Sequence, residues 1–184
     1  MQQKVKLRKK YSNLRKKKYF EINKKFFFPL LKLFRKKFKE KPIKIAIYYP
    51  SNFELNVLKV LELKYFLSQN ILLPVIEKNN LMKFYPWKKN EVLNVNKFGM
   101  IEPLQTKAKV PDVMLIPLLA FDKDKFRLGY GKGYYDRYLN KYIKIHKGIL
   151  TVGVAFSFQK HHKLPLNKHD IKLNCILTEK EIYL

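Results

Sequence analysis

Apolar and polar positions follow helical spacing through the first part of the chain. Apolar residues recur every three or four positions across residues 4–22, and a second apolar stripe runs across residues 23–40, with Pro29 near its first turns. We predict an amphipathic helix over each of these ranges. Together they would form a basic helical N-terminal region, residues 1–41, that packs on the rest of the chain.

Past residue 41 the pattern changes to short, almost continuous apolar runs, which are typical of buried strands. The predicted strands cover residues 43–49, 71–76, 112–117, 151–156 and 173–177. Helical patterns stand between some of these runs, one with an apolar stripe from Leu55 to Phe66 and another from Tyr135 to Ile143. Strands that alternate with helices predict an α/β fold, a single domain over residues 1–184 with a mostly parallel sheet flanked by helices.

The stretch from Phe121 to Arg137 interrupts this alternation with a glycine-rich loop. Half of the six glycines of the chain stand there at alternate positions, namely Gly129, Gly131 and Gly133. Glycine allows positive φ and close approach of a ligand to the backbone, so the N–H groups of such a loop can together bind an anion. Arg127 and Lys132 add cations beside it. The spacing matches neither the P-loop nor the dinucleotide fingerprint, and the aromatic residues around it disfavour a mobile linker.

The composition fits a folded protein of a reducing compartment. Hydrophobic residues make up 47% of the 184 positions and aromatic residues 15%, which argues against disorder. A lone cysteine, Cys175, excludes an internal disulfide. No charge-free apolar run approaches the ~20 residues of a membrane helix, and no signal peptide is recognisable. We expect a cytoplasmic protein with no membrane partner.

The formal charge of +26 allows two interpretations. Residues 1–41 hold 17 Lys or Arg against 2 Glu, which would suit a nucleic-acid-binding surface. The abundance of Lys and Asn and the scarcity of Gly also fit a proteome-wide compositional bias, and we favour that explanation. We therefore expect no specific nucleic-acid partner. Neither interpretation explains the glycine-rich loop.

The loop resembles the signature of a known enzyme family. The run Arg-Leu-Gly-x-Gly-x-Gly-Tyr-Tyr-Asp, from Arg127 to Asp136, is similar to that of 5-formyltetrahydrofolate cyclo-ligases, also called 5,10-methenyltetrahydrofolate synthetases. The first helix adds a similar Lys-x-x-Leu-Arg run, from Lys4 to Arg8. The resemblance spans most of the chain. It implies ATP-dependent cyclisation of 5-formyltetrahydrofolate to 5,10-methenyltetrahydrofolate through a phosphorylated formyl intermediate, with release of ADP and phosphate and with Mg²⁺ as a cofactor.

The resemblance also implies roles for individual residues, with Arg127 and Lys132 as catalytic residues. The implied ATP-binding residues are Lys4, Arg8, Arg127, Leu128, Gly129, Tyr130, Gly131, Lys132, Gly133, Tyr134 and Tyr135. The implied substrate-binding residues are Arg8, Tyr49, Glu54, Tyr130, Gly131, Lys132, Gly133 and Tyr134. Asp136 and Asp170 would bind Mg²⁺. The substrate would be taken with or without a polyglutamate tail, by a monomer.

Several assignments have alternatives. Arg15 competes with Arg8 as the arginine of the helix motif, and Glu54 by itself could cap the predicted helix that follows it. Trp87 could stack on the substrate or belong to the core. Asn174 stands where the family often has a second acidic residue, although an amide carbonyl can also bind Mg²⁺. A sugar-phosphate or CoA-transferase-like enzyme, which needs no ATP, is a further alternative for the function.

Overall fold

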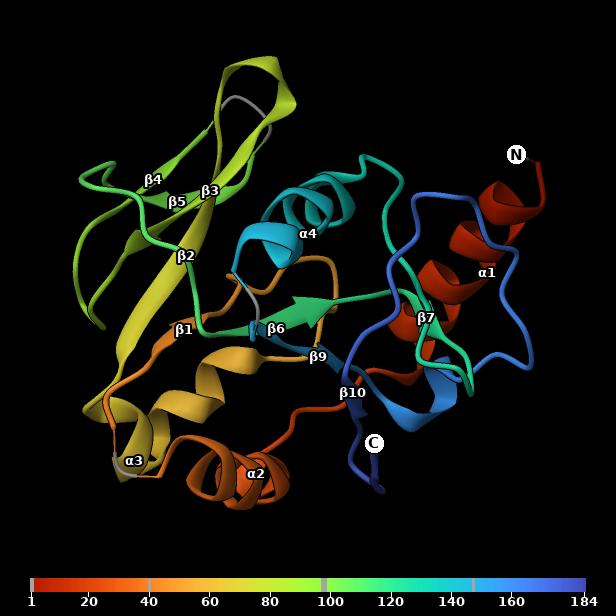
Figure 1. Cartoon of the computed structure of the whole chain (residues 1–184). Coiled ribbons are helices and arrows are strands. Elements are labelled where there is room, and N and C mark those ends of the chain that lie inside the picture. Colours follow the sequence, from red (N-terminus) through yellow and green to blue (C-terminus); the bar gives the residue numbers. More distant parts are fainter. Residues whose placement is uncertain (1, 40, 97–98, 147) are drawn as a thin grey trace.

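The computed structural model describes residues 2–39, 41–96, 99–146 and 148–184 and contains a seven-stranded sheet (Figure 1). The strand order is β11-β10-β9-β6-β1-β2-β3. The bounds are β1 Lys44–Ala46, β2 Asn70–Ile76, β3 Met82–Pro86, β6 Val113–Pro117, β9 Leu150–Val154, β10 Cys175–Leu177 and β11 Ile182–Tyr183. The strands from β10 to β2 are parallel to one another, and the edge strands β3 and β11 are antiparallel to their neighbours. The predicted single α/β domain with a mostly parallel sheet is therefore confirmed.

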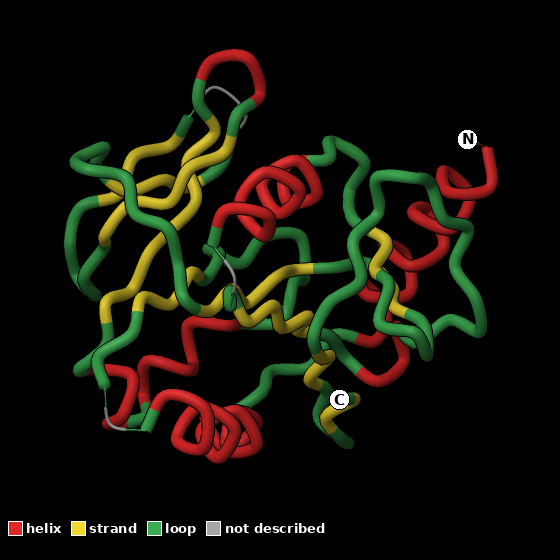
Figure 2. The backbone as a smooth tube through the Cα atoms, viewed as in Figure 1, coloured by secondary structure: helices red, strands yellow, loops and turns green. Residues whose placement is uncertain are grey.

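Helices cover both faces of this sheet, so its central strands are apolar on both sides. Helix α4 (Tyr134–Ile145) lies on one face, while α2 (Phe28–Phe38) and α3 (Lys64–Leu67) lie on the other (Figure 2). Alternate strand residues separate into the two cores: Val113 and Leu115 pack on the α2 side, whereas Met114 and Ile116 pack on the α4 side. This double burial explains why the strands appear in the sequence as continuous apolar runs.

Helix α1 (Gln2–Lys18) does not belong to either face but lies beside the carboxyl ends of the strands (Figure 1). Its Tyr11 packs with Leu119, Leu128 and Leu164 in a small separate core. Leu119 follows β6 directly, and Leu128 belongs to the hairpin of β7 (Ala120–Phe121) and β8 (Arg127–Leu128). The contact fixes α1 against the segment that leads into the glycine-rich loop.

Several predicted boundaries are wrong for local reasons. The first helix ends at Lys18, and Asn23 then caps the short 3₁₀-helix η1 (Lys24–Phe27) by accepting a hydrogen bond from the Lys25 backbone N–H. The predicted helix from Leu55 to Phe66 is a 3₁₀-helix, η2 (Val57–Glu62), followed by the single turn of α3. Leu63 separates the two because it adopts an extended conformation, with φ −91° and ψ 125°.

Some elements have no counterpart among the predictions. They are the edge strands β3 and β11, the hairpin of β4 (Leu93–Val95) and β5 (Ile101–Pro103), the hairpin β7–β8, and the 3₁₀-helices η3 (Lys78–Asn80) and η4 (Ser157–Gln159). The largest differences in strand length are at β1, which spans only Lys44–Ala46, and at the strand expected over residues 173–177, which begins at Cys175. Within the described ranges, no helix is long and apolar enough to cross a membrane.

Candidate active site

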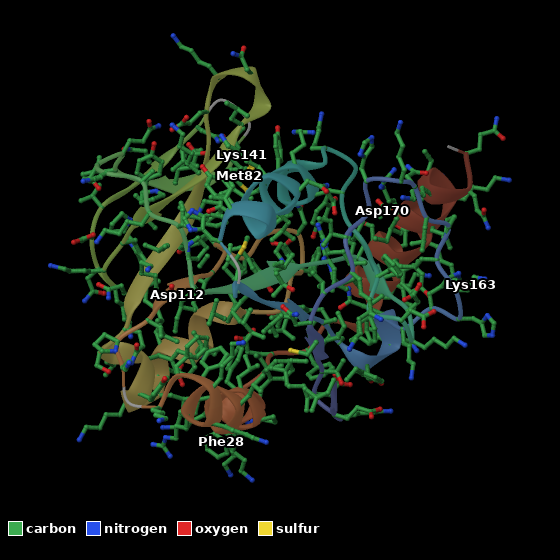
Figure 3. The ribbon with its side chains drawn as sticks, viewed as in Figure 1. Phe28, Met82, Asp112, Lys141, Lys163 and Asp170 are labelled. Carbon is green, nitrogen blue, oxygen red and sulfur yellow. The ribbon has the colours of Figure 1, made fainter. Side chains whose placement is uncertain are left out.

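The predicted site residues gather at the carboxyl ends of the parallel strands, where α/β folds bind ligands. Glu54 follows β1, the glycine-rich loop follows β6 and the hairpin β7–β8, and Asp170 precedes β10. Helix α1 contributes residues from the side, and Asp170 lies next to this helix (Figure 3). Four segments that are far apart in the sequence thus meet at one edge of the sheet.

The hairpin β7–β8 delivers the loop to this edge. Asp122, which is 2% exposed, accepts hydrogen bonds from the backbone N–H groups of Asp124 and Phe126 and so closes the hairpin turn. Beyond β8, Gly131 and Gly133 adopt φ values of +98° and +68°. The predicted need for glycine is therefore confirmed at these two positions, whereas Gly129 lies outside the left-handed region.

Helix α1 points two cations at the loop and its surroundings. The Lys4 Nζ lies 2.5 Å from an Asp170 carboxylate oxygen, and the Arg8 Nε donates a hydrogen bond of 2.9 Å to the Gly129 carbonyl oxygen. The Arg8 guanidinium covers Gly131 so closely that a Cβ at that position would lie 3.0 Å from its Cζ. The structure thus brings Lys4 and Arg8 together with the loop, as the motif in the first helix suggests.

Arg127 is held in a fixed orientation at the start of the loop. Its Nη2 lies 2.6 Å from an Asp136 carboxylate oxygen, and its Nη1 donates to the Ile171 carbonyl oxygen at 3.2 Å. The Arg127 side chain is 4% exposed and that of Asp136 is 28% exposed. Asp136 stands in the first turn of α4, where the helix dipole favours a negative charge.

Glu54 forms the second half of the site. One of its carboxylate oxygens accepts a hydrogen bond of 2.5 Å from the Tyr130 hydroxyl, and the other accepts one of 2.9 Å from the Ser51 backbone N–H. Burial raises the pKa of Glu54, while these hydrogen bonds and the positive charge of Arg15 act in the opposite direction. Since η2 begins only at Val57 and the carboxylate binds Ser51, Glu54 does not cap a helix.

Tyrosines around Glu54 are kept protonated. Burial, followed by the negative charge of Glu54, raises the pKa values of Tyr48 and Tyr130 above their ordinary value. The same two causes raise the pKa of Tyr135, against which the Arg127 charge acts. The site therefore offers neutral hydroxyl groups as hydrogen-bond donors and acceptors next to one carboxylate.

A hollow of about 420 Å³ opens beside Glu54. Tyr49, another of the predicted substrate-binding residues, lines it together with Glu54. The remaining lining residues are mostly apolar or aromatic, among them Tyr19, Phe53 and Leu58. A hollow lined by aromatic, apolar and polar side chains next to one buried carboxyl group is suited to a flat heterocycle that carries N–H donors.

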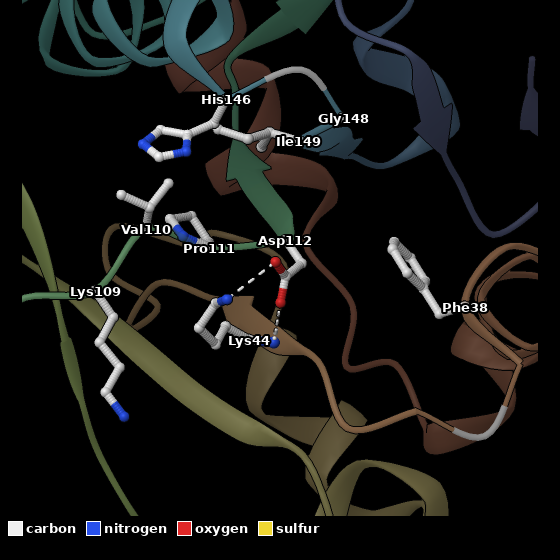
Figure 4. Close-up of a pocket in the computed structure, with 9 residues that line it drawn as sticks. All are labelled: Phe38, Lys44, Lys109, Val110, Pro111, Asp112, His146, Gly148 and Ile149. Carbon is white, nitrogen blue, oxygen red and sulfur yellow. Dashed lines mark hydrogen bonds and ion pairs between the residues drawn. The ribbon is translucent and has the colours of Figure 1, made fainter.

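A second hollow, of about 450 Å³, lies at the opposite end of the sheet (Figure 4). It is lined by residues that precede or begin the strands, including Lys44, Asp112 and Ile149. Lys44 and Asp112 form an ion pair of 3.1 Å there, and the Asp112 carboxylate also accepts from the Lys44 backbone N–H. None of the predicted site residues lines this hollow, so it is separate from the candidate active site.

The structure decides three of the alternatives that the sequence leaves open. Trp87 is 7% exposed and belongs to the core on the α2 side. Asn174 is not placed to replace an acidic metal ligand, because its side-chain oxygen accepts from the Thr151 N–H and hydroxyl at 2.7 and 2.9 Å. Arg15 does not compete with Arg8: it is 1% exposed and enters the site separately. The sequence does contain a signal for Arg15 as a site residue: it stands seven residues after Arg8, a spacing that places both on one helix face.

Asp136 and Asp170, the predicted Mg²⁺ ligands, lie near each other. The Asn140 side-chain amide, one turn after Asp136, donates to the carbonyl oxygens of both Asp136 and His169. Among the described residues no three His, Cys, Asp or Glu side chains converge as a metal site. Two carboxylates still suit Mg²⁺, which keeps several waters and completes its shell with substrate phosphates.

A family model and several known proteins match this chain. The model of the 5-formyltetrahydrofolate cyclo-ligase family matches residues 1–179. A 5-formyltetrahydrofolate cyclo-ligase of Haemophilus influenzae is 30% identical over 73% of this chain and 74% of its own length. A probable cyclo-ligase of Schizosaccharomyces pombe is 29% identical over 62% of this chain and 64% of its own length.

Two solved structures share the fold. The 5,10-methenyltetrahydrofolate synthetase of Aquifex aeolicus superposes with a TM-score of 0.76 at 32% identity, covering 97% of this chain and 91% of that one. The Mycoplasma pneumoniae synthetase superposes with a TM-score of 0.71 at 25% identity, covering 95% of this chain and 97% of that one.

Proposed function

Because the chain belongs to the 5-formyltetrahydrofolate cyclo-ligase family, we propose that it converts 5-formyltetrahydrofolate to 5,10-methenyltetrahydrofolate at the expense of ATP. One observation supports this proposal above the others. The glycine-rich loop with its nearby cations and a buried carboxyl group beside a hollow meet at Tyr130, whose hydroxyl binds Glu54 while its backbone belongs to the loop. The reaction needs a nucleotide and a pterin next to each other.

We propose that the reaction proceeds in two displacements. The formyl oxygen attacks the γ-phosphorus of ATP, and ADP leaves. The substrate's N10 then attacks the activated formyl carbon, the N10 proton is lost, and phosphate departs with the former formyl oxygen. Both nucleophiles belong to the substrate, so the enzyme needs no Ser, Cys or His nucleophile and acts through positioning and charge neutralisation.

The phosphate side of the site is assigned to α1 and the loop. Lys4, Arg8 and Arg127 would neutralise the phosphates, and the N–H groups between Gly129 and Gly133 would act as preorganised dipoles. Arg127 is the best placed for the transferring group, because Asp136 and the Ile171 carbonyl fix its guanidinium before any ligand arrives. The reaction would therefore not lose the conformational entropy that ordering a mobile arginine side chain costs.

The folate side is assigned to the Glu54 hollow. The Glu54 carboxylate would accept hydrogen bonds from the N–H groups of the pterin, with Tyr49, Tyr130 and Tyr134 around the rings. Lys132 is exposed in the loop and would meet the glutamate carboxylates of the substrate, with or without a polyglutamate tail. All these residues belong to one chain, which supports our proposal that the enzyme acts as a monomer.

Asp136 and Asp170 are proposed to hold Mg²⁺ once ATP is bound. When bound, the ion supplies further neutralisation of the phosphate charge. Both carboxylates are paired with cations in the structure, Asp136 with Arg127 and Asp170 with Lys4. We expect Lys4 to turn toward the phosphates when the ion takes its place at Asp170, while Arg127 keeps its contacts with Asp136 and the Ile171 carbonyl oxygen. Cys175 is a buried free thiol, in keeping with the cytoplasmic location that we propose.

An absorbance assay tests the function directly. Purified protein is mixed with 5-formyltetrahydrofolate and Mg²⁺, and the near-ultraviolet absorbance of the methenyl product is followed with and without ATP. We expect product only with ATP. An RNA-binding protein, or a sugar-phosphate or CoA-transferase-like enzyme, would give none under either condition.

A further inference from the structure

Arg15 is an exception on its helix. Its neighbours Lys16, Lys17 and Lys18 are exposed, whereas Arg15 is 1% exposed and among the largest fully buried side chains of the described residues. A buried guanidinium is costly unless its N–H groups and charge are satisfied. Its burial therefore points to a specific role at the place where it is held.

The guanidinium joins three segments of the site. Its Nη2 donates a hydrogen bond of 2.7 Å to the Asn52 carbonyl oxygen, and its Nη1 donates at 3.5 Å to the Leu118 carbonyl oxygen after β6. Its Cζ lies 5.5 Å from the centre of the Tyr130 ring. The Nε is buried with no hydrogen-bond partner among the described residues. Arg15 thus links α1 to the segment before Glu54 and to the glycine-rich loop.

The segment that Arg15 holds is strained. Asn52 and Phe53 have φ values of 47° and 60°, a left-handed conformation in two consecutive residues that are not glycine. For a bulky residue such as Phe this conformation is rare and persists only where the surroundings enforce it. The turn is closed by hydrogen bonds from the Ser51 N–H to the Glu54 carboxylate and from the Glu54 N–H to the Ser51 carbonyl. The strained turn is what orients the Glu54 carboxylate.

We propose that Arg15 is a positioning residue that holds the Ser51–Glu54 turn and the Tyr130 ring, so that Glu54 and Phe53 face the folate hollow. Phe53 is 46% exposed and lines that hollow, so the same turn presents an aromatic face to the substrate. This inference rests on the proposed function. It adds that substrate affinity on the folate side depends on an arginine of α1, the helix whose other cations serve ATP.

The charge of Arg15 has a second effect. Burial raises the pKa of Glu54, and Arg15 is the cation that opposes this rise. The other ionisable groups that act on Glu54 are Tyr130 in the loop, Tyr48 after β1 and Tyr135 in α4. All three are phenols whose pKa is raised. Removal of Arg15 should therefore leave Glu54 harder to ionise, and binding that needs the carboxylate should fail at a higher pH than in the wild type.

Two substitutions separate the geometry from the charge. Arg15→Met keeps the unbranched stem of the side chain but removes both charge and hydrogen bonds, while Arg15→Lys keeps the charge. For Arg15→Met we expect the KM for 5-formyltetrahydrofolate to rise about 10–100-fold, the effect of a lost charge-assisted hydrogen bond. The KM for ATP should stay within about twofold. Arg35→Met, on the exposed face of α2, is the control and should change neither constant.

The pH profile of kcat/KM gives a readout that a merely structural role would not change. The acid limb of the Arg15→Met profile should move to higher pH. In Arg15→Lys the limb should return to the wild-type pH, because the charge is kept, whereas the KM for 5-formyltetrahydrofolate should stay raised. The proposal is overturned if Arg15→Met binds folate as the wild type does, if it weakens ATP and folate equally, or if its acid limb does not move.

Hydrogen exchange of the ligand-free protein keeps the inference testable whatever the enzyme's activity. In Arg15→Met, the Ser51 and Glu54 amides should exchange at least about tenfold faster, while amides in β2 should exchange as in the wild type. Unchanged exchange at the turn would overturn the positioning role. Absence of cyclo-ligase activity in the wild type would instead refute the proposed function, and the exchange data would still decide the role of Arg15.

Discussion

Arg127 combines contacts that hold the fold together with the catalytic role that we propose for it. Its guanidinium is almost completely buried and bridges β8 to Asp136 of α4 and to the Ile171 carbonyl. The sequence predicts a phosphate-binding cation at this position from its place beside three glycines, but the ion pair with Asp136 depends on how α4 packs. A substitution should therefore affect folding and catalysis together.

Arg127→Ala should lower the turnover of the cyclo-ligase reaction about 10²–10³-fold, as does the loss of one preorganised donor at a developing charge. It should also lower the free energy of unfolding by about 1–3 kcal/mol, because Asp136 and the Ile171 carbonyl lose a charged partner. Steady-state kinetics and urea denaturation measure the two effects. Turnover near the wild-type value at saturating ATP would remove Arg127 from the mechanism.

Gly131→Val should weaken ATP binding while the protein stays folded. The position has φ +98°, and a Cβ there would press on the Arg8 guanidinium at 3.0 Å. Titration calorimetry with ATP measures the affinity. Gly148→Val is a matched control, since Gly148 has φ +123° with nothing within 4 Å of an added Cβ. Equal loss of ATP affinity in both variants would mean that general backbone strain, rather than the loop, is responsible.

At the scale of elements, α1 lies along one edge of the sheet and contacts several segments of the site. Lys4, Arg8 and Arg15 lie on one face of the helix and reach Asp170, Gly129 and Asn52 respectively. The periodicity of the sequence predicts the helix and the shared face, because both follow from local spacing. It does not predict the strained Asn52–Phe53 turn or the break at Leu63. Those depend on tertiary partners, Arg15 for the turn and core packing for the break.

Lys4→Ala combined with Arg8→Ala should raise the KM for ATP by about tenfold or more, because two cations are removed from the phosphate side. The matched control is Lys6→Ala combined with Lys9→Ala, which removes two exposed cations from the same helix. Steady-state kinetics at saturating 5-formyltetrahydrofolate measure the KM for ATP of both double variants. A similar increase in the control would show that the number of charges on α1 matters more than their position.

At the scale of the whole molecule, the net charge of +26 is not what defines the site. Lys16, Lys17, Lys18, Lys36 and Lys37 are exposed and lie outside the residues assigned to ATP or folate. The basic composition alone would suit nucleic acid as well as a compositional bias, whereas we assign the glycine-rich loop and its partners to a small substrate. The fold class was predictable from the strand and helix pattern. The antiparallel edge strands were not, because their pairing is set by distant parts of the chain.

Neutralising these five lysines to Gln should leave cyclo-ligase activity within about twofold of the wild type. The wild type should bind RNA only weakly at physiological salt, with an affinity that falls steeply as salt is raised, as expected for non-specific counterion release. Fluorescence anisotropy with a labelled RNA checks this. Tight, salt-resistant binding that is lost in the five-lysine variant would establish a second role for the basic surface.

The fate of the formyl oxygen tests the proposed reaction most directly. The protein is given 5-formyltetrahydrofolate labelled with ¹⁸O in the formyl group, together with unlabelled ATP, and the released phosphate is analysed by mass spectrometry. Phosphoryl transfer to the formyl oxygen predicts one ¹⁸O atom in each phosphate formed with the methenyl product. Release of the label into water, with unlabelled phosphate, would contradict a phosphorylated formyl intermediate.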